Sequence, residues 1–244
     1  MKKGIDVSKH NGVIDFAKVK AAGYDFVIIR AGYGKLISQK DTMFEQNYRN
    51  AKLAGLNVGA YWYSYALSFE EAKAEAAACL KCINGKQFEY PIYFDLEEQK
   101  QFAKGKDFCS KLVQTFCSEI ERAGYWAGLY TSKSYLTTHI DANTAKRYAL
   151  WVAQWAAQCT YQGTYGMWQK SEKGQVDGIK GYVDLDESYF DYPKSIMASG
   201  KNGFNKQPVS LKTEYHVILR FDDAEKAQAA AKLFDAEVKA VTTT

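Results

Sequence analysis

The sequence predicts an α/β protein: an irregular (β/α) barrel of about five βα units followed by three strands, with a small C-terminal α+β appendage. Three observations predict this fold: a repeated helix–glycine–strand pattern, eight β-rich segments, and a change of composition near residue 203. The chain has 244 residues, of which 47% are hydrophobic and 25% charged, the balance of an ordinary folded protein. At roughly 150 residues per domain, this length fits one large domain and an appendage.

A helix end, an Ala-Gly pair and a β-rich run follow one another three times in the first 130 residues. The three copies are centred on Gly23, Gly55 and Gly124. Glycine suits a helix end because it adopts the left-handed backbone conformation without steric cost. The glycines are 32 and 69 residues apart, and one βα unit takes about 30 residues or more, so the second interval holds two units. This alternation predicts a parallel sheet.

Eight β-rich segments have the number and spacing of the strands of a closed barrel. Between them, apolar residues at helical spacing predict a helix from Phe108 to Ile120, and Ser68 with Glu71 matches a capping box before a helix over 72–80. The last three strands are too close together for full helices, so the final third of the barrel is expected to be irregular. The expected strands cover residues 4–8, 26–32, 58–65, 91–97, 126–131, 150–155, 165–170 and 182–187.

The C-terminal part of the chain has a different composition. Residues 204–244 contain no Gly, Trp or Cys, and about 40 residues are marginal for independent folding. An alternating apolar pattern predicts one strand there, followed by a helix. We therefore expect a barrel domain over 1–195, a linker over 196–208, and a small βα appendage or truncated second module over 209–244.

Charge and cysteine content exclude several classes of partner. The net charge of +4 is too small to indicate nucleic acid, and no apolar run approaches the roughly 20 residues that cross a bilayer. Cys79 and Cys82 form a lone C-x-x-C in an alanine-rich helix, without a second pair at zinc spacing, so they are expected to be buried thiols. We expect no cofactor, no metal, no nucleic-acid or membrane partner, and a monomer.

An acidic pair follows the fourth expected strand. Asp95 and Glu97 are two residues apart, so they face the same side of the strand. Carboxylates about 6–7 Å apart along a strand repel each other when both are charged, so one of them is expected to keep its proton. An acid beside an ionised carboxylate is the pair that glycosidic cleavage requires.

Two further acids are expected near that pair. Asp6 lies within the first strand, where an unpaired carboxylate would be costly, and Asp184 lies in the last strand. First and last strands are neighbours in a barrel, so these acids can lie at the same open end of the barrel as Asp95 and Glu97. We call this end the mouth of the barrel. Asp186 is two residues further along the same strand and faces the same side as Asp184, so it is the alternative to Asp184 as the second of these acids. A satisfied buried cap or an ion pair with Arg30 is the alternative role for Asp6.

Aromatic residues also gather at the expected strand ends. Half of them are expected to fill the core, and the others to form the wall of a cleft, because sugar rings offer apolar faces to aromatic planes. The aromatic content is high, at 15%. The strand-end aromatics are Tyr61, Trp62, Tyr63, Tyr65, Tyr130, Trp151, Trp155 and Trp168.

Several segments resemble the lysozymes of glycoside hydrolase family 25, in the same order and over roughly residues 4–192. The resemblance implies a barrel that cleaves the β-1,4 bond between N-acetylmuramic acid and N-acetylglucosamine in bacterial peptidoglycan. The family often has Ala-Tyr-His-Phe where this chain has Ala-Tyr-Trp-Tyr at 60–63. The segments are Gly-Ile-Asp-Val-Ser-Lys-His-Asn-Gly at 4–12, Gly-Ala-Tyr-Trp-Tyr at 59–63, Tyr-Phe-Asp-Leu-Glu at 93–97, Gly-Leu-Tyr-Thr-Ser at 128–132, Leu-Trp-Val-Ala at 150–153, Trp-Gln at 168–169 and Val-Asp-Leu-Asp at 183–186.

The resemblance also implies roles for individual residues. By position, Glu97 is expected to be the general acid, Asp95 its carboxylate partner, and Asp6 and Asp184 supporting acids. The expected site of action is the cell wall or the extracellular space, although no signal peptide is visible at the N-terminus. Substrate contacts are expected from Tyr61, Tyr63, Tyr130, Trp151 and Gln169.

Three alternatives stay open at this point. A chitinase-like glycosidase is disfavoured because its D-x-x-D-x-D-x-E strand, aligned on Glu97, meets Tyr93 and Tyr90 where it needs acids. A non-catalytic glycan-binding barrel would keep the aromatic residues but would gain nothing from four convergent acids. A metal-dependent deacetylase using Asp6 and His10 is the third alternative.

Overall fold

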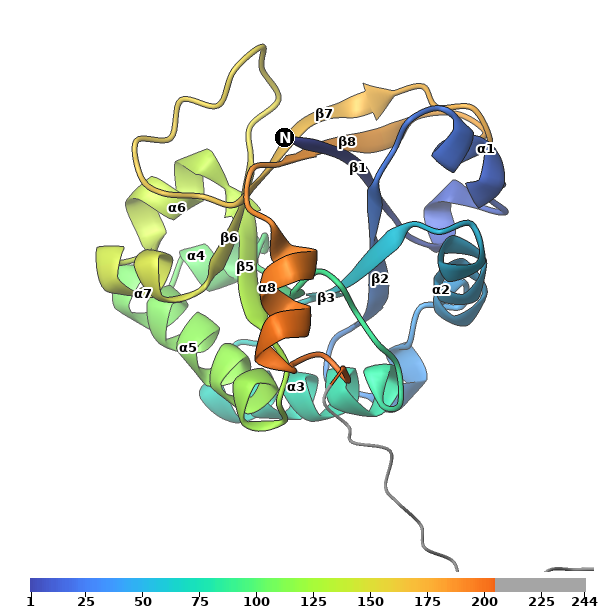
Figure 1. Cartoon of the computed structure of the whole chain (residues 1–244). Helices are drawn as coiled ribbons and strands as arrows, with labels where there is room; N and C mark the ends of the chain where they lie inside the picture. Colours follow the sequence, from blue (N-terminus) through green and yellow to red (C-terminus); the bar gives the residue numbers. More distant parts are fainter. Residues whose placement is uncertain (205–244) are drawn as a thin grey trace, which may run out of the picture. The chain divides into compact units, whose positions relative to one another are not determined.

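A computed structural model describes residues 1–204, in which eight strands form a closed barrel surrounded by helices (Figure 1). Neighbours in the barrel follow the order of the chain, from β1 to β8. Each expected strand overlaps an observed one, so the predicted barrel is confirmed; the expected appendage over 209–244 lies outside the described residues. The strands are β1 (Lys2–Val7), β2 (Phe26–Tyr33), β3 (Asn57–Tyr63), β4 (Ile92–Asp95), β5 (Ala127–Ser132), β6 (Ala149–Ala153), β7 (Met167–Gly174) and β8 (Val183–Ser188).

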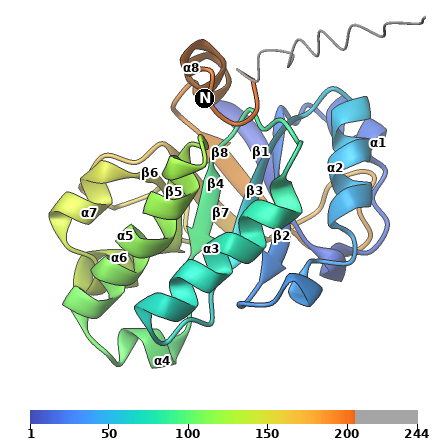
Figure 2. The same cartoon turned by 90° about the horizontal axis from the view of Figure 1, so that it is seen from below.

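Helices connect most of the strands and cover the outside of the barrel. Figure 2 shows α3 and α5 side by side on this outer surface. The helices are η1 (Lys9–Asn11), α1 (Phe16–Ala21), η2 (Ile37–Gln39), α2 (Phe44–Leu53), α3 (Phe69–Ile83), α4 (Gln99–Phe102), α5 (Lys106–Arg122), α6 (Lys133–His139), α7 (Ala142–Arg147) and α8 (Tyr192–Ser199).

The local signals in the sequence mark helix ends correctly. Gly23, Gly55 and Gly124 have φ angles of 87°, 74° and 85°, the left-handed region that favours glycine. At the start of α3, the Ser68 hydroxyl accepts a hydrogen bond of 3.1 Å from the backbone N–H of Glu71, the N-cap contact expected there.

Strand β8 runs antiparallel to both of its neighbours, β7 and β1. The parallel pairing predicted from the helix–strand repeat therefore does not extend to β8, which lies in the final third of the barrel that was expected to be irregular. Only residues 175–182 connect β7 to β8, and a parallel return needs a crossover of a dozen or more residues. The reversal brings the start of β8 beside the end of β1, so that the Cα atoms of Asp184 and Asp6 are partners across the two strands.

Aromatic side chains fill the inside of the barrel. Tyr93 and Phe26 are fully buried there, and glycines on neighbouring strands leave room for their rings. A Cβ atom on Gly128 would lie 2.4 Å from the Tyr93 ring, and one on Gly4 would lie 2.2 Å from the Phe26 ring. Side chains thus fill the barrel, as in other eight-stranded barrels.

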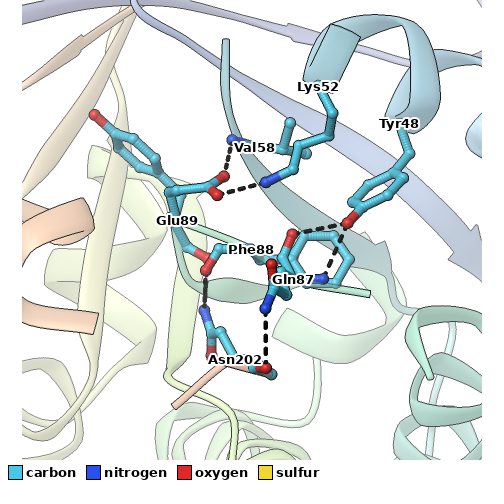
Figure 3. A network of polar contacts seen from close by, with 9 residues as sticks. Tyr48, Lys52, Val58, Gln87, Phe88, Glu89 and Asn202 are labelled. Carbon is cyan, nitrogen blue, oxygen red and sulfur yellow. Dashed lines mark hydrogen bonds and ion pairs between the residues drawn. The ribbon is translucent and has the colours of Figure 1, made fainter. Parts of the chain in front are cut away.

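The end of the barrel where the strands begin is closed by α8 and the turn after it. Asn202 is fully buried and has a left-handed φ of 56°. Its side-chain amide donates hydrogen bonds to the carbonyls of Phe88 (3.0 Å) and Tyr90 (2.9 Å), and its oxygen accepts one from the Trp126 N–H (2.6 Å). Figure 3 shows this amide beneath the segment that leads into β4.

The linker expected over 196–208 is therefore wrong for residues 196–204. Ile196 is fully buried in the cluster that fills the barrel, and Asn202 satisfies three backbone groups there. This stretch is mostly polar, which is typical of a linker. It packs nevertheless, because the Ile196 side chain and the Asn202 amide are enough to hold it against the barrel.

Cys79 and Cys82 are buried free thiols on α3, as the sequence predicts. Within residues 1–204, no helix combines the length and the apolar character needed to cross a bilayer.

Replacing Asn202 by leucine is expected to lower the free energy of unfolding by about 1–3 kcal/mol, because buried backbone groups lose their partners. Denaturant unfolding of the two proteins measures the difference. An unchanged unfolding midpoint would contradict the structural role of this amide.

Candidate active site

The four acids that the sequence singled out surround one tyrosine at the mouth of the barrel. Asp6 lies on β1, Asp95 ends β4, Glu97 follows it by two residues, and Asp184 lies near the start of β8. The pKa of Tyr130 is raised well above its usual range, first by burial and then by the charges of all four acids. Charges act on a hydroxyl in this way only over short distances. The structure thus brings the predicted acids together.

The direction of β8 determines which of its acids reaches the mouth. Asp184 pairs in register with Asp6 and is half-buried, whereas Asp186 pairs with Gly4, deeper in the barrel, and is 2% exposed. Asp184 is therefore the acid at the mouth, and Asp186 lies beneath it.

A glutamine orients Asp6. The Gln169 amide donates a hydrogen bond of 2.8 Å to Asp6 Oδ2, and its oxygen accepts bonds from Tyr130 Oη (2.9 Å) and Trp155 Nε1 (3.0 Å). An indole nitrogen can only donate, so the glutamine oxygen must face Trp155 and the nitrogen must face Asp6. This contact fixes the direction of the Asp6 carboxyl group.

Asp6 and Asp186 form a carboxyl pair below the mouth. Asp186 Oδ1 accepts a 2.8 Å hydrogen bond from Trp151 Nε1. Burial raises the pKa of both acids well above the usual range; Asp186 and Asp184 raise that of Asp6 further, and Asp184 raises that of Asp186. Two neighbouring carboxyl groups cannot both stay ionised in a desolvated site at neutral pH, so the pair holds a proton.

Glu97 is the exposed member of the four acids. The pKa of Glu97 is raised to about 7, first by desolvation of its carboxyl group and then by the charges of Asp184 and Glu98, while the nearby Tyr130 hydroxyl lowers it. Asp184 has a pKa of about 6, raised by burial and by the charge of Glu172. At pH 7 the mouth therefore presents a half-protonated Glu97 beside a mostly ionised Asp184.

Asp95 lies below Glu97 and is 3% exposed. Burial raises its pKa well above the usual range, Glu97 and Glu98 raise it further, and Arg30 lowers it. The repulsion expected between the two acids thus raises the pKa of Asp95, but the charge that raises the pKa of Glu97 most is that of Asp184, on another strand. No spacing rule within one strand could have identified that partner.

Arg30 does not pair with Asp6. Its Nε donates a 2.8 Å hydrogen bond to Asp41 Oδ2, so the ion-pair alternative for Asp6 is wrong. His10 is exposed in η1 while Asp6 is buried, so these two residues form no joint site. Among residues 1–204, no group of three or more His, Cys, Asp or Glu side chains has a geometry that could hold a metal ion.

The aromatic residues divide into buried supports and exposed faces. Trp151 and Gln169 are 1% and 3% exposed and hold Asp186 and Asp6, so the expectation that they contact substrate stays a prediction. Tyr130 is also buried and acts through its hydroxyl group. Tyr61 and Tyr63 are half-buried near the acids.

Sequence reasoning missed two contributors to the mouth. The sequence predicts Trp155 only as a strand-end aromatic, but the side chain is 58% exposed and its indole nitrogen donates a hydrogen bond to Gln169. Glu98 accepts a 2.8 Å hydrogen bond from the Tyr63 hydroxyl. The run of two glutamates after Asp95 was a visible signal for Glu98, whereas nothing local in the sequence identifies the anchor of Trp155.

A closed α/β barrel with crowded acids at its mouth, one of them titrating near neutrality, has the architecture of a glycoside hydrolase. The sequence matches the family described as Glycosyl hydrolases family 25 over residues 5–179. The chain belongs to this family, and not to that of the chitinase-like glycosidases.

Similar proteins cover most of the chain. The autolytic lysozyme of Clostridium acetobutylicum is 30% identical over 199 residues, which are 81% of this chain and 58% of that protein. Lysozyme M1 of Streptomyces globisporus is 30% identical over 202 residues, 76% of this chain and 67% of that protein. This chain thus spans little more than half the length of the first of these relatives.

Solved structures show the same fold. The CTP1L endolysin superposes with a TM-score of 0.70 at 31% identity, over 81% of this chain and 70% of that one. The autolysin LytC of Streptococcus pneumoniae, in complex with a synthetic peptidoglycan ligand, superposes with a TM-score of 0.68 at 28% identity, over 76% of this chain and 46% of that one.

Replacing Asp186 by asparagine is expected to stabilise the protein, and more at pH 8 than at pH 5. Because folding raises the pKa of Asp186, the unfolded chain releases this proton first, and stability falls as the pH rises above the ordinary carboxyl range. Asparagine keeps an acceptor for Trp151 without a charge. Thermal unfolding at both pH values measures the gain, and about 2–4 °C in Tm corresponds to 1 kcal/mol in a chain of this length.

Asp177→Asn is the matched control, because Asp177 is exposed. It is expected to leave the difference between the two pH values unchanged. A lower Tm for Asp186→Asn at pH 8 would contradict the carboxyl pair.

Proposed function

We propose that this chain is a peptidoglycan hydrolase that cleaves the β-1,4 bond between N-acetylmuramic acid and N-acetylglucosamine. Family membership and the similarity to lysozymes, an autolysin and an endolysin support the substrate class. The observation that carries the proposal is Glu97, an exposed carboxyl group whose pKa of about 7 lies near working pH. The proposed place of action is the bacterial cell wall.

Glu97 is the general acid in this proposal. Its proton passes to the glycosidic oxygen as the bond between that oxygen and the anomeric carbon breaks, and the sugar ring develops positive charge. The ionised Asp184 across the mouth stabilises this charge. Water then adds to the anomeric carbon, and its released proton restores Glu97.

Asp95 is the carboxylate partner of Glu97 but does not reach the ring. With 3% of its surface exposed, it is too enclosed for direct attack on a sugar. We assign it to the buried wall beneath Glu97, whose charge raises the pKa of Asp95. Asp6 and Asp186 hold the opposite wall.

Tyr61 and Tyr63 are the proposed substrate contacts, with the exposed face of Trp155 as an addition. All three lie near the acids and present an aromatic surface. Aromatic planes of this kind suit the apolar faces of sugar rings.

A non-catalytic glycan-binding barrel would bind through the same aromatic residues. It would have no use for buried carboxyl groups, which cost free energy at neutral pH. Incubation with purified peptidoglycan, followed by identification of the new reducing sugar, separates the two functions. N-acetylmuramic acid at the new end supports the proposal, whereas binding without new ends supports the alternative.

Glu97→Gln is expected to fold normally and to lose nearly all lysis of purified cell walls, because glutamine has no proton to transfer. A loss of about 100-fold or more is expected from removing a general acid. Turbidity of cell-wall suspensions measures lysis, and circular dichroism verifies the fold. Substantial residual activity would remove Glu97 from the role of acid.

Activity is expected to fall as the pH rises through about 7, by about tenfold per pH unit above it, since only protonated Glu97 is active. Asp184→Asn should move this alkaline limb to lower pH, because the charge of Asp184 raises the pKa of Glu97. The rate of soluble muropeptide release against pH measures both effects. A limb that stays in place in Asp184→Asn would contradict the assigned coupling.

A further inference from the structure

Glu97 lies beyond the end of β4, yet the segment that carries it is anchored on both sides. On one side, Thr131 Oγ1 donates a 2.8 Å hydrogen bond to the Leu96 carbonyl. On the other, the side-chain oxygen of Gln101 accepts a 3.3 Å bond from the Glu98 N–H. Thr131 and Gln101 are both fully buried. The general acid of the proposed reaction thus stands between two buried anchors.

The Gln101 amide can adopt one orientation only. Its nitrogen donates to Ser64 Oγ (2.9 Å) and to the Ala66 carbonyl (3.1 Å). A carbonyl can only accept and the Glu98 N–H can only donate, so the nitrogen must face the loop after β3 and the oxygen must face Glu98. Gln101 therefore ties the loop after β3 to the segment after β4.

Ser64 connects Gln101 to an acid on α3. Its oxygen accepts from Gln101 and from the Ala66 N–H (3.2 Å), and its hydroxyl lowers the pKa of the neighbouring Glu75. Glu75 is 1% exposed and accepts a 2.8 Å bond from the Tyr65 N–H. These buried side chains, Ser64, Glu75 and Gln101, form a network that crosses from α3 to α4.

A one-turn helix such as α4 does not need a buried polar network of this size to hold it in place. Helix α4 is a single turn, Gln99–Phe102, and burying an amide, a hydroxyl and a carboxyl group costs free energy unless every partner is present. The network ends at the residue after Glu97. Proton transfer requires the acid to be placed to within a fraction of an ångström.

We propose that Gln101 is a positioning residue for Glu97: supported by Ser64 and Glu75, it fixes the Glu98 backbone and so holds the Glu97 carboxyl group at the mouth of the barrel. This inference rests on the proposed function, in which Glu97 is the general acid.

Gln101→Met tests the inference, because methionine keeps the shape of glutamine and removes its hydrogen bonds. We expect kcat on soluble peptidoglycan fragments to fall by about 10- to 100-fold with KM within about twofold. The alkaline limb of the pH profile should move to lower pH, because a released Glu97 gains water and its pKa returns toward the ordinary range. A role in stability alone would move neither kcat nor the limb.

Asn202→Leu is the matched control. Asn202 is also a fully buried amide with three hydrogen-bond partners, but it lies at the opposite end of the barrel. It is expected to lower the unfolding midpoint while kcat and the pH profile of the folded protein stay unchanged.

Ser64→Ala provides a second, smaller change that removes one partner of Gln101. It should lower kcat in the same direction and shift the same limb. If Gln101→Met does not fold, Ser64→Ala decides the outcome.

The results separate this inference from the proposed function. If Glu97→Gln is inactive but Gln101→Met and Ser64→Ala keep the kcat and pH profile of the unmodified protein, the positioning role is wrong and the proposed function stands. If Glu97→Gln stays active, the proposed function fails whatever the other variants do. If the Asn202→Leu control shifts the limb as Gln101→Met does, the shift reports general destabilisation and overturns the inference.

Discussion

The crowding of carboxyl groups at one mouth of the barrel is the constraint on which the rest of the structure depends. Asp6, Asp95, Asp184 and Glu97 all act on the hydroxyl of Tyr130, and at neutral pH so many negative charges cannot coexist in a desolvated space. Protons are therefore retained inside the folded protein. Retaining these protons lowers the stability of the fold at neutral pH. The same crowding raises the pKa of the exposed acid, Glu97, to about 7.

The reversed strand β8 makes this crowding possible. A short connection from β7 forces it to return antiparallel, and the residues near its start then lie at the mouth beside the end of β1. Asp184 consequently faces Glu97, and Asp186 is placed below, against Asp6. In a wholly parallel barrel the mouth would instead receive the residues at the far end of this strand.

Neutral hydrogen-bonding groups orient the acids that repel each other. Gln169 directs Asp6, Trp151 holds Asp186, and Gln101 anchors the residue that follows Glu97. These donors and acceptors lie on strands and helices far apart in the sequence, and all three are buried. Buried polar groups with every partner present are rigid, and a rigid wall is what a general acid needs on its inner side.

The sequence by itself determined the barrel, its eight strands, the helix ends at Gly23, Gly55 and Gly124, and the acids that meet at the mouth, because hydrophobic periodicity, glycine conformation and residue parity are local properties. Tertiary structure alone decided the direction of β8, the packing of residues 196–204 under the barrel, and the burial of Trp151 and Gln169. It also made Asp184 the charge that raises the pKa of Glu97. Each of these features depends on which distant segments of the chain pack together. Burial and electrostatic coupling depend on distances in space, and spacing along the sequence does not predict those distances.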